Sequence, residues 1–469
     1  MGSQVTLVGL DFGSTTSSAV VADASLVQRA ATGRVEIGEI RERYRSEFAF
    51  TPFDGGAIDL PRVCALLDGW LAAAGVREGE VFGGGAIVTG LAARRRNAGE
   101  LARAVRERAF GAVMAVAEDP CLEAWMAFMG SAAAVSRAHP ETPILNIDIG
   151  GGTTNLAIGI AGEVRCTGCL AVGARHVAVT PGTSRIAALS ELGRDLLKHL
   201  GLRKGPGDAL LPAEIEAIVD LQVGLIEAAV DGRAGALEAP IARRHVEVPL
   251  AVPPELAGAA LTFSGGVGEL VYAGLDGRAL PPPGHYGDLG IELGRRVLAS
   301  PRLSSTVRVP PGVGRATAYG LLRHATQLSG STLFLPHPEI LPLEDLPILG
   351  RIAPGSSPDD IARAVDLVRR SGRGGCVEVT LGAPGAAAVR DLGQRIAAAL
   401  RARPFPEQLP FVLLLRENAA KALGGYVTGW GSARAEILVI DEVDARGAHF
   451  VQIGRLHEQV LPVSFHGMS

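Results

Sequence analysis

Aromatic residues and lysines are scarce in this sequence. Only 4% of the 469 residues are Phe, Trp or Tyr, so the cores have to be built mainly from Ala, Val, Leu and Ile. Three lysines (Lys198, Lys204 and Lys421) leave nearly all positive charge to arginine. The net charge is −4, and the nearest approach to a basic cluster is the run 94–96 of three arginines, which is typical of a solvated face. These features argue against a nucleic-acid partner.

Long apolar runs are also missing. No segment reaches the roughly 18 consecutive apolar residues that span a bilayer. The N-terminus does not combine a positively charged start with an apolar stretch, as a secretory signal does. We therefore expect no membrane partner and a cytoplasmic location.

The five cysteines are odd in number and scattered, which fits a reducing compartment. Cys166 and Cys169 form a Cys-x-x-Cys, but no second cysteine pair or spaced histidine pair lies near them in the sequence. A zinc site needs such further ligands. We therefore interpret the two as unlinked thiols.

The composition is that of a globular protein, with 47% hydrophobic and 20% charged residues, and the length fits two or three domains. We expect boundaries that give domains 1–143, 144–330 and 331–469. The last begins with a proline-rich stretch, 336–360, that is typical of a linker. Helix-like segments (358–371 and 385–402) then alternate with short strands, which predicts a smaller α/β region.

Two segments repeat one pattern: apolar strand, Asp, glycine-rich turn with a Ser/Thr pair, apolar strand. In the first, Asp11 precedes a turn at 13–16. In the second, Asp148 precedes a turn at 150–154. A strand–turn–strand is a hairpin, which differs from the strand-to-helix step of a Walker or Rossmann loop. The repetition predicts a duplicated α/β domain.

Turns of this kind present backbone N–H groups and small hydroxyls to an anion. Two facing turns can hold a polyphosphate from both sides, and an Asp before each can hold a hydrated Mg²⁺, which takes one or two carboxylates. Phosphoryl transfer then needs positioning and charge neutralisation rather than a nucleophilic side chain. A third motif, 261–269 (Leu-Thr-Phe-Ser-Gly-Gly-Val-Gly-Glu), predicts a strand that ends in a glycine-rich turn.

The order of these motifs resembles that of the actin-like ATPase superfamily, which includes actin, heat-shock chaperone ATPases and sugar kinases. The resemblance implies two duplicated actin-like (ribonuclease H-like) lobes, ATP and Mg²⁺ as ligands, and connecting helices near 121–135 and 312–325. Asp11 and Asp148 are then the metal-associated, catalytic carboxylates. Glu123 is the candidate for orienting the attacking water, with Glu118 as a competitor and a solvated or capping role as the alternative. The expected nucleotide-binding residues are Gly13, Ser14, Thr15, Thr16, Gly150, Gly151, Gly152, Thr153, Thr154, Ser264, Gly265, Gly266 and Gly268.

A closer resemblance, over nearly the whole chain, is to the ethanolamine ammonia-lyase reactivase family. The segments that carry it are 146–155 (Asn-Ile-Asp-Ile-Gly-Gly-Gly-Thr-Thr-Asn), 261–269, 315–320 (Arg-Ala-Thr-Ala-Tyr-Gly), 329–332 (Ser-Gly-Ser-Thr), 421–424 (Lys-Ala-Leu-Gly) and 439–443 (Val-Ile-Asp-Glu-Val).

The resemblance implies a chaperone that uses Mg²⁺ and ATP to exchange damaged cobalamin in ethanolamine ammonia-lyase for intact adenosylcobalamin. The lyase is then the protein partner, a homodimer is compatible with the sequence, and association with a bacterial microcompartment is an alternative to a free cytoplasmic protein.

The chain departs from the family pattern at several positions. His449 and Gln452 replace two acids of a C-terminal strand, Leu91 replaces a Glu, and Arg95 and Arg96 replace a Lys/Glu pair. These changes leave open an altered partner or activity. A sugar or small-carboxylate kinase, a filament-forming actin relative and a non-catalytic nucleotide-binding scaffold remain the alternatives.

Overall fold

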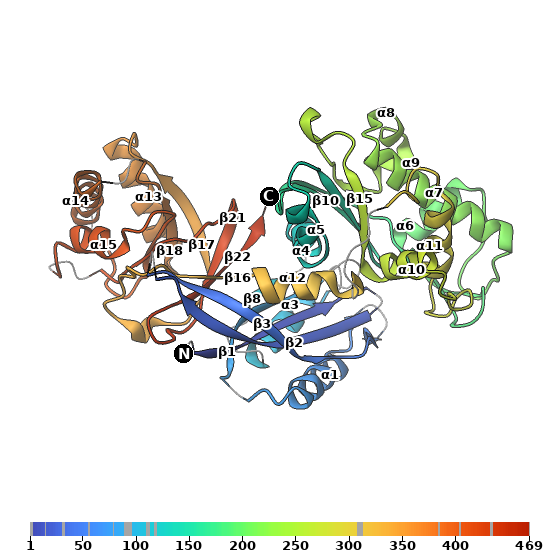
Figure 1. Cartoon of the computed structure of the whole chain (residues 1–469), viewed down its shortest axis with the longest axis horizontal. Coiled ribbons are helices and arrows are strands. Elements are labelled where there is room, and N and C mark those ends of the chain that lie inside the picture. Colours follow the sequence, from blue (N-terminus) through green and yellow to red (C-terminus); the bar gives the residue numbers. More distant parts are fainter. Residues whose placement is uncertain are drawn as a thin grey trace.

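The computed structural model describes residues 3–14, 16–30, 33–54, 57–77, 79–88, 96–108, 113–116, 120–306, 313–382, 385–402, 405–431 and 435–468. They form three large β-sheets with helices packed around them, and the sheets follow one another along the chain (Figure 1). The first sheet lies at the bottom of the view in blue, the second to the right in green, and the third to the left in orange and red.

The first sheet has the path β3-β2-β1-β7-β8, with β4 paired to β2. Its strands are β1 (Gln4–Phe12), β2 (Thr16–Gln28), β3 (Val35–Arg45), β4 (Ala49–Phe50), β7 (Val81–Val88) and β8 (Val113–Val116). Helices α1 (Leu60–Ala73) and α3 (Ala98–Arg108) share a core with it. Helix α1 begins where Asp59 caps it, because the Asp59 carboxylate accepts from the Arg62 N–H at 3.2 Å.

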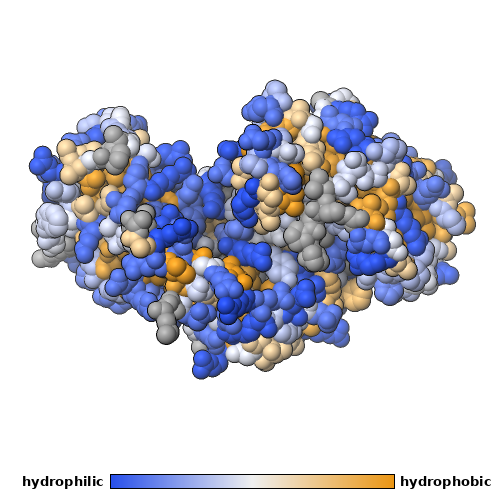
Figure 2. Space-filling view, in the orientation of Figure 1, coloured by the Kyte–Doolittle hydropathy of each residue, from blue (hydrophilic) through white to orange (hydrophobic). Residues whose placement is uncertain are grey.

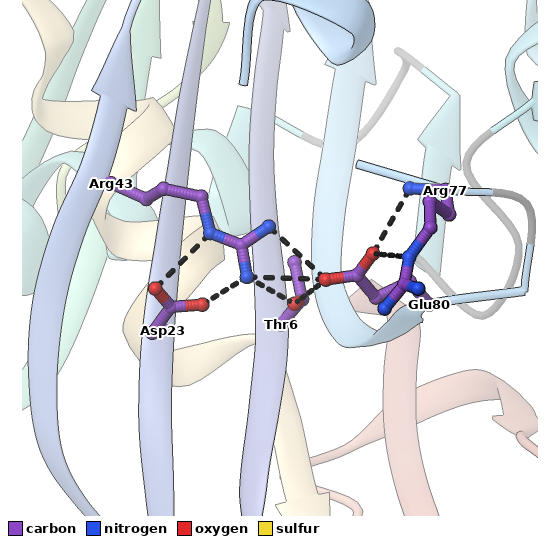
Figure 3. Close-up of polar contacts among 5 residues, drawn as sticks. All are labelled: Thr6, Asp23, Arg43, Arg77 and Glu80. Carbon is purple, nitrogen blue, oxygen red and sulfur yellow. Dashed lines mark hydrogen bonds and ion pairs between the residues drawn. The ribbon is translucent and has the colours of Figure 1, made fainter. Parts of the chain in front are cut away.

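The arginine Arg43 contacts side chains on two strands of the first sheet and a residue next to a third (Figure 3). The register of β1 and β2 places these contacts at the end of the pair opposite to the first predicted turn. Arg43 on β3 pairs with Asp23 on β2 and donates to the Thr6 hydroxyl on β1 at 3.0 Å. It also donates to Glu80, just before β7, at 3.2 Å. The backbone N–H of Arg77, with the side chains around it, lowers the pKa of Glu80 to about 2. Each charged group of this network has partners within it, so we assign it a structural role.

The second sheet has the order β14-β11-β10-β9-β15. Its strands are β9 (Ile144–Ile149), β10 (Thr154–Ile160), β11 (Glu163–Leu170), β14 (Val246–Val248) and β15 (Ala260–Ser264). In both sheets an antiparallel pair, β1-β2 or β9-β10, is extended by one more antiparallel strand and is joined on its other side by a parallel strand. The two lobes therefore repeat one topology, and the predicted fold class, duplicated α/β lobes with a further α/β region, is confirmed.

Helices around the second sheet form the largest hydrophobic core of the described chain together with it. They are α6 (Glu191–His199), α7 (Pro212–Val230), α10 (Gly265–Leu275) and α11 (Gly290–Ala299). A short 3₁₀ turn, η1 (Ala174–His176), precedes the small hairpin of β12 (Val177–Val179) and β13 (Ile186–Leu189).

Two helices cross between the lobes: α4 (Pro120–Ser131) and α12 (Ala316–His324). They touch backbone to backbone. A Cβ on Gly130 would lie 1.8 Å from the Ala316 carbonyl oxygen, and one on Gly320 would lie 2.1 Å from that of Met126. Helix α12 also lies against β1, where a Cβ on Gly9 would be 2.1 Å from the Ala318 oxygen. The crossing therefore requires glycine at these positions.

The third sheet has the order β16-β22-β21-β17-β18-β19-β20. Its strands are β16 (Thr326–Leu328), β17 (Leu343–Ile352), β18 (Gly375–Val379), β19 (Phe411–Leu415), β20 (Ile437–Ile440), β21 (Ala448–Ile453) and β22 (Pro462–Met468). Helices α13 (Pro358–Ser371), α14 (Ala386–Ala402) and α15 (Ala420–Thr428) share a core with its parallel strands.

The linker prediction is wrong for 343–352, which is the central strand β17. Its proline, Pro347, pairs with Phe450 of β21, just after a register shift between Leu343 and Leu346. The third sheet also begins before residue 331, because β16 pairs with β22. Figure 2 shows mainly hydrophilic residues around the hollow between this C-terminal region and the second lobe.

Candidate functional site: a cleft between two glycine-rich loops

The first predicted turn joins β1 to β2. Asp11 is the penultimate residue of β1, and the turn closes where the Gly13 N–H donates to the Thr16 carbonyl at 3.0 Å. Thr51 supports the turn from the side, since its hydroxyl donates to the Gly13 carbonyl at 2.7 Å. Asp11, Gly13, Ser14 and Thr16 all line one cleft. The predicted residue Thr15 lies outside the described residues.

The second predicted turn joins β9 to β10 and lines the same cleft. The Gly150 N–H donates to the Thr153 carbonyl at 2.9 Å, the same closure as in the first turn. Asp148 and residues 150–153 face the cleft. Thr154 is fully buried in β10 and donates to the Val172 carbonyl at 2.8 Å, so its hydroxyl supports the strand behind the loop. The structure thus brings Asp11 and Asp148 into one site.

The third motif differs from its prediction. After β15 the chain enters helix α10 at Gly265 and makes no turn. Gly265 has φ +78°, and a Cβ there would lie 2.5 Å from the Ile149 carbonyl oxygen, so the close approach of α10 to β9 requires glycine. Gly265 and Gly266 line the cleft. Gly268 instead packs against Phe263, where a Cβ would lie 3.2 Å from the backbone.

Asp148 is a buried carboxylate in a chain of hydrogen bonds. The Ser264 hydroxyl donates to Asp148 Oδ1, and the Asn146 amide donates to the Ser264 oxygen at 2.8 Å. Burial raises the pKa of Asp148 to about 6, and the Ser264 hydrogen bond opposes that rise. Among the described residues, burial and the Ser264 hydroxyl are what shift this pKa, and a bound cation would compensate the charge of the ionised carboxylate.

Glu123 lies in the first turn of α4 and lines the cleft, and its role in orienting a water molecule stays a prediction. Its competitor Glu118 lies outside the described residues.

Several cleft residues were not predicted from the sequence. They are Phe48, Ala174, Val267, Glu269, Leu270, Tyr286, Asp288, Gly290, Gly314 and Thr317. Glu269 and Val267 belong to the third motif, in which the sequence indicates only Ser264 and the glycines as binding residues. Tyr286 and Asp288 follow a proline-rich stretch that carries no sign of a site, and Asp288 is buried and accepts from the Gly290 N–H at 2.9 Å.

The cleft encloses about 1010 Å³, a volume that includes space open to solvent. The polar lining of the cleft comes from the two loops and from carboxylate side chains, and its apolar residues include Leu270 and Phe48. Among the described residues there is no group of three or more His, Cys, Asp or Glu arranged to hold a metal ion. A site built on Asp11 and Asp148 would therefore rely on two carboxylates, as Mg²⁺ sites beside phosphates do.

The other sequence features lie apart from the cleft. Cys166 and Cys169 are three residues apart on β11 and so point to opposite faces of the strand. His449 and Gln452 both lie on β21, the former exposed and the latter buried. Leu91 and Arg95 lie outside the described residues. None of the helices in the described ranges has the length and apolar character needed to cross a membrane.

Comparison with known proteins decides the family. The sequence profile of the family described as "Ethanolamine utilisation protein EutA" matches residues 3–468. The chain belongs to the EutA family. The resemblance to the ethanolamine ammonia-lyase reactivase family is thereby confirmed.

Two curated relatives cover nearly the whole chain. Both are named "Ethanolamine ammonia-lyase reactivase EutA". The protein of Salmonella typhimurium is 30% identical over 465 residues, which are 96% of this chain and 95% of the relative. That of Escherichia coli is 29% identical over 473 residues, with the same coverage.

The solved structures that match this chain are less similar to it. The ethanolamine utilization protein EutJ of Carboxydothermus hydrogenoformans is 17% identical and covers 68% of this chain and 89% of its own, with a TM-score of 0.30. A Ppx/GppA family member of Aquifex aeolicus is 15% identical over 68% of this chain and 87% of its own, with a TM-score of 0.32.

Proposed function

We propose that this protein is an ATP-dependent reactivating chaperone for adenosylcobalamin-dependent ethanolamine ammonia-lyase, which promotes exchange of damaged cobalamin for intact adenosylcobalamin. The observation that carries the proposal is the full-length match to the EutA family, whose curated relatives bear the name of that reactivase. We expect it to act in the cytoplasm, free or associated with a microcompartment.

Nucleotide binding is assigned to the cleft. The loops at 13–16 and 150–153 offer backbone N–H groups to phosphates, and the start of α10 at Gly265 and Gly266 offers a surface without side chains to the adenosine. Leu270 and Tyr286 supply apolar surface for a base.

The residues present fit a Mg²⁺ ion. Asp148 is buried, and its pKa is raised because burial penalises its charge, which a bound divalent cation would compensate. Asp11 lines the same cleft from the other lobe. We propose that these two carboxylates hold the ion, which when bound supplies neutralisation of phosphate charge.

The chain's own residues then perform three tasks. The two loops bind and orient the phosphates. Ser264 favours the ionised form of Asp148, and the Asn146 amide donates to the Ser264 oxygen. Glu123 orients a water molecule and accepts its proton, which gives slow ATP hydrolysis. Because α4 carries Glu123 and crosses α12 between the lobes, a change of nucleotide can alter the angle between them and so the affinity for the lyase.

Reactivation of blocked lyase tests the proposal. Cyanocobalamin-inhibited ethanolamine ammonia-lyase from the same organism is incubated with this protein, adenosylcobalamin, Mg²⁺ and ATP, and ethanolamine deamination is followed. We expect deamination to recover with ATP and to stay absent when ATP or the protein is omitted. No recovery would overturn the reactivase assignment. If a small polyol or sugar instead stimulated ATP turnover many-fold, a kinase would be the better interpretation.

The pH dependence of nucleotide binding should depend on Ser264. The Ser264 hydroxyl lowers the pKa of Asp148, so Ser264→Ala should raise that pKa further and leave less ionised carboxylate near neutral pH. Since Mg²⁺ binds the ionised form, affinity for Mg²⁺–ATP is lost as pH falls through the pKa of Asp148, and this loss should begin at higher pH in the variant. Titration calorimetry over a pH series measures the midpoint.

Ser131→Ala is the matched control for this measurement. Its hydroxyl contacts the Asn146 oxygen at 3.2 Å and does not reach Asp148. We expect the wild-type midpoint for this variant. Equal midpoints for Ser264→Ala and wild type would contradict the role of Ser264.

A further inference from the structure

Each carbonyl group of the second loop, 150–153, accepts a hydrogen bond from the protein. The Gly150 carbonyl accepts from the Ala174 N–H at 3.2 Å and the Gly151 carbonyl accepts from the Arg175 N–H at 2.6 Å. The Gly152 carbonyl is held by the His176 ring, whose Nε2 lies 2.8 Å from the oxygen. The last carbonyl, that of Thr153, accepts a hydrogen bond from the Gly150 N–H. One short segment, 174–176, therefore supports three consecutive glycines, the first two through backbone N–H groups and the third through the His176 side chain.

The chemistry of the partners fixes the direction of these hydrogen bonds. A carbonyl oxygen only accepts, so His176 Nε2 carries the proton that reaches Gly152. Nδ1 lies 2.7 Å from the Ser190 hydroxyl, and that oxygen accepts from the Gly193 N–H at 2.9 Å. The Ser190 hydroxyl can therefore donate its proton to Nδ1. A continuous chain runs from the start of α6 through Ser190 and His176 to the loop.

His176 has no room to move. Its side chain is buried, and its own backbone carbonyl accepts from the Ser190 N–H at 3.1 Å. A Cβ on Gly193 would lie 2.0 Å from the same oxygen, so α6 packs directly against this residue. The ring therefore holds the Gly152 carbonyl at a fixed position.

The orientation of the carbonyls decides where the N–H groups of the loop point. In the part of the chain that the structure describes, the N–H groups of Gly151, Gly152 and Thr153 donate to no protein acceptor, and all three residues line the cleft. Each carbonyl shares a planar trans peptide group with the N–H of the next residue, and the two point in opposite directions. Because the carbonyls of the three glycines are held, these N–H groups are available to an anion in the cleft. His176 acts on the peptide group that carries the Thr153 N–H.

We propose that His176 is a positioning residue for phosphate binding, which acts by holding the Gly152 carbonyl so that the loop 150–153 presents its N–H groups to the phosphates of the nucleotide. The inference rests on the proposed function, since it assigns phosphates to that loop. It deepens that function by naming a residue outside the cleft on which phosphate affinity depends.

The test separates phosphate affinity from adenosine affinity. Calorimetric dissociation constants for Mg²⁺–ATP and for adenosine are measured on wild type, His176→Ala and His176→Gln. His176→Ala leaves the buried Gly152 carbonyl without its donor, and we expect Mg²⁺–ATP binding to weaken about tenfold while adenosine binding stays within about twofold of wild type. His176→Gln, whose amide can donate to the carbonyl, should recover part of the loss.

His245→Ala is the matched control. His245 is also buried, and its ring lies 6.4 Å from that of His176, but its Nδ1 contacts the Ile241 carbonyl and not the loop. We expect His245→Ala to melt at a lower temperature than wild type and to keep the wild-type ratio of ATP to adenosine affinity. If His176→Ala fails to fold, two other variants replace it: His176→Gln, and Ser190→Ala, which removes the hydrogen bond to Nδ1. The ratio of ATP to adenosine affinity in these variants then tests the role of His176.

Three results would overturn the inference. Wild-type ATP affinity in folded His176→Ala would show that the loop needs no such support. An equal fall in ATP and adenosine affinity would show a general structural role. A wild-type protein that binds no adenine nucleotide would overturn the proposed function and this inference with it, whereas the first two results leave the proposed function intact.

Discussion

Replacing Asp148 with Asn is expected to raise the melting temperature of the nucleotide-free protein and to abolish its response to Mg²⁺–ATP. Burial raises the pKa of this carboxyl from its usual 3.8 to about 6, so the ionised form is disfavoured in the folded state. The folded state binds this proton more tightly than the unfolded state does. The resulting contribution to the free energy of unfolding is fully present below pH 3.8 and is lost as pH rises through about 6. At pH 7 the buried charge therefore opposes folding, on the order of 2–3 kcal/mol, and Asn removes that cost.

The same substitution removes one of the two proposed Mg²⁺ ligands. Wild type should melt at higher temperature when Mg²⁺–ATP is added, because a ligand that binds only the folded state stabilises it. Asp148→Asn should lose this rise, together with ATP-dependent recovery of the lyase. Thermal melting with and without Mg²⁺–ATP, followed by the lyase assay, measures both effects.

Asp441→Asn is the control for this pair of effects. Asp441 is also fully buried, but it lies after β20 and accepts from the Ala420 N–H at 3.0 Å at the start of α15, away from the cleft. Its replacement should lower the melting temperature and preserve the response to Mg²⁺–ATP. A response retained by Asp148→Asn would contradict the assignment of Asp148.

The second large effect is expected at the crossing of the two connecting helices. Gly320→Ala places a Cβ 2.1 Å from the Met126 carbonyl oxygen, and backbone atoms of α4 cannot move aside as a flexible side chain could. The helices must separate, which should destabilise the protein by about 3 kcal/mol. Gly130→Ala, on the other helix, should act in the same way because its Cβ would meet the Ala316 oxygen. Scanning calorimetry gives the melting temperatures.

Helical glycines elsewhere in the chain provide the controls. A Cβ added to Gly69 in α1 or to Gly224 in α7 would have no atom within 4 Å, so the Ala variants meet no clash. They should be neutral or stabilising by about 0.5–1 kcal/mol, since alanine loses less backbone entropy in a helix. A Gly320→Ala protein that melts within about one degree of wild type would show that the crossing tolerates a wider separation.

Sequence patterns predict secondary structure best where the residues that determine it are close together in the sequence. The range 358–371 predicted for a helix is that of α13, since Ser357 and Asp360 form a capping box at its start and Gly372 ends it in the left-handed conformation. The two hairpins are predictable for a similar reason, because glycines and hydroxyl residues between apolar runs specify the turns.

Features that depend on tertiary contacts were not predictable in the same way. The prolines in and around β17 are typical of a linker, although Pro347 pairs with Phe450 within the third sheet. The glycines after Ser264 suggested a turn, whereas they allow α10 to begin against β9. Tyr286 reaches the cleft from a segment without a motif, and His176 contacts Gly152 across 24 residues of sequence. Their roles follow from packing.

Calorimetric titration of Mg²⁺–ATP into the wild-type protein and into the double variant Asp11→Ala/Asp148→Asn tests the central claim most directly. We expect wild type to bind one Mg²⁺–ATP per chain, with affinity that falls sharply when Mg²⁺ is removed, and the folded double variant to bind none. No binding by wild type, or equal binding by the double variant, would contradict the claim that these two carboxylates and their loops form a single nucleotide site.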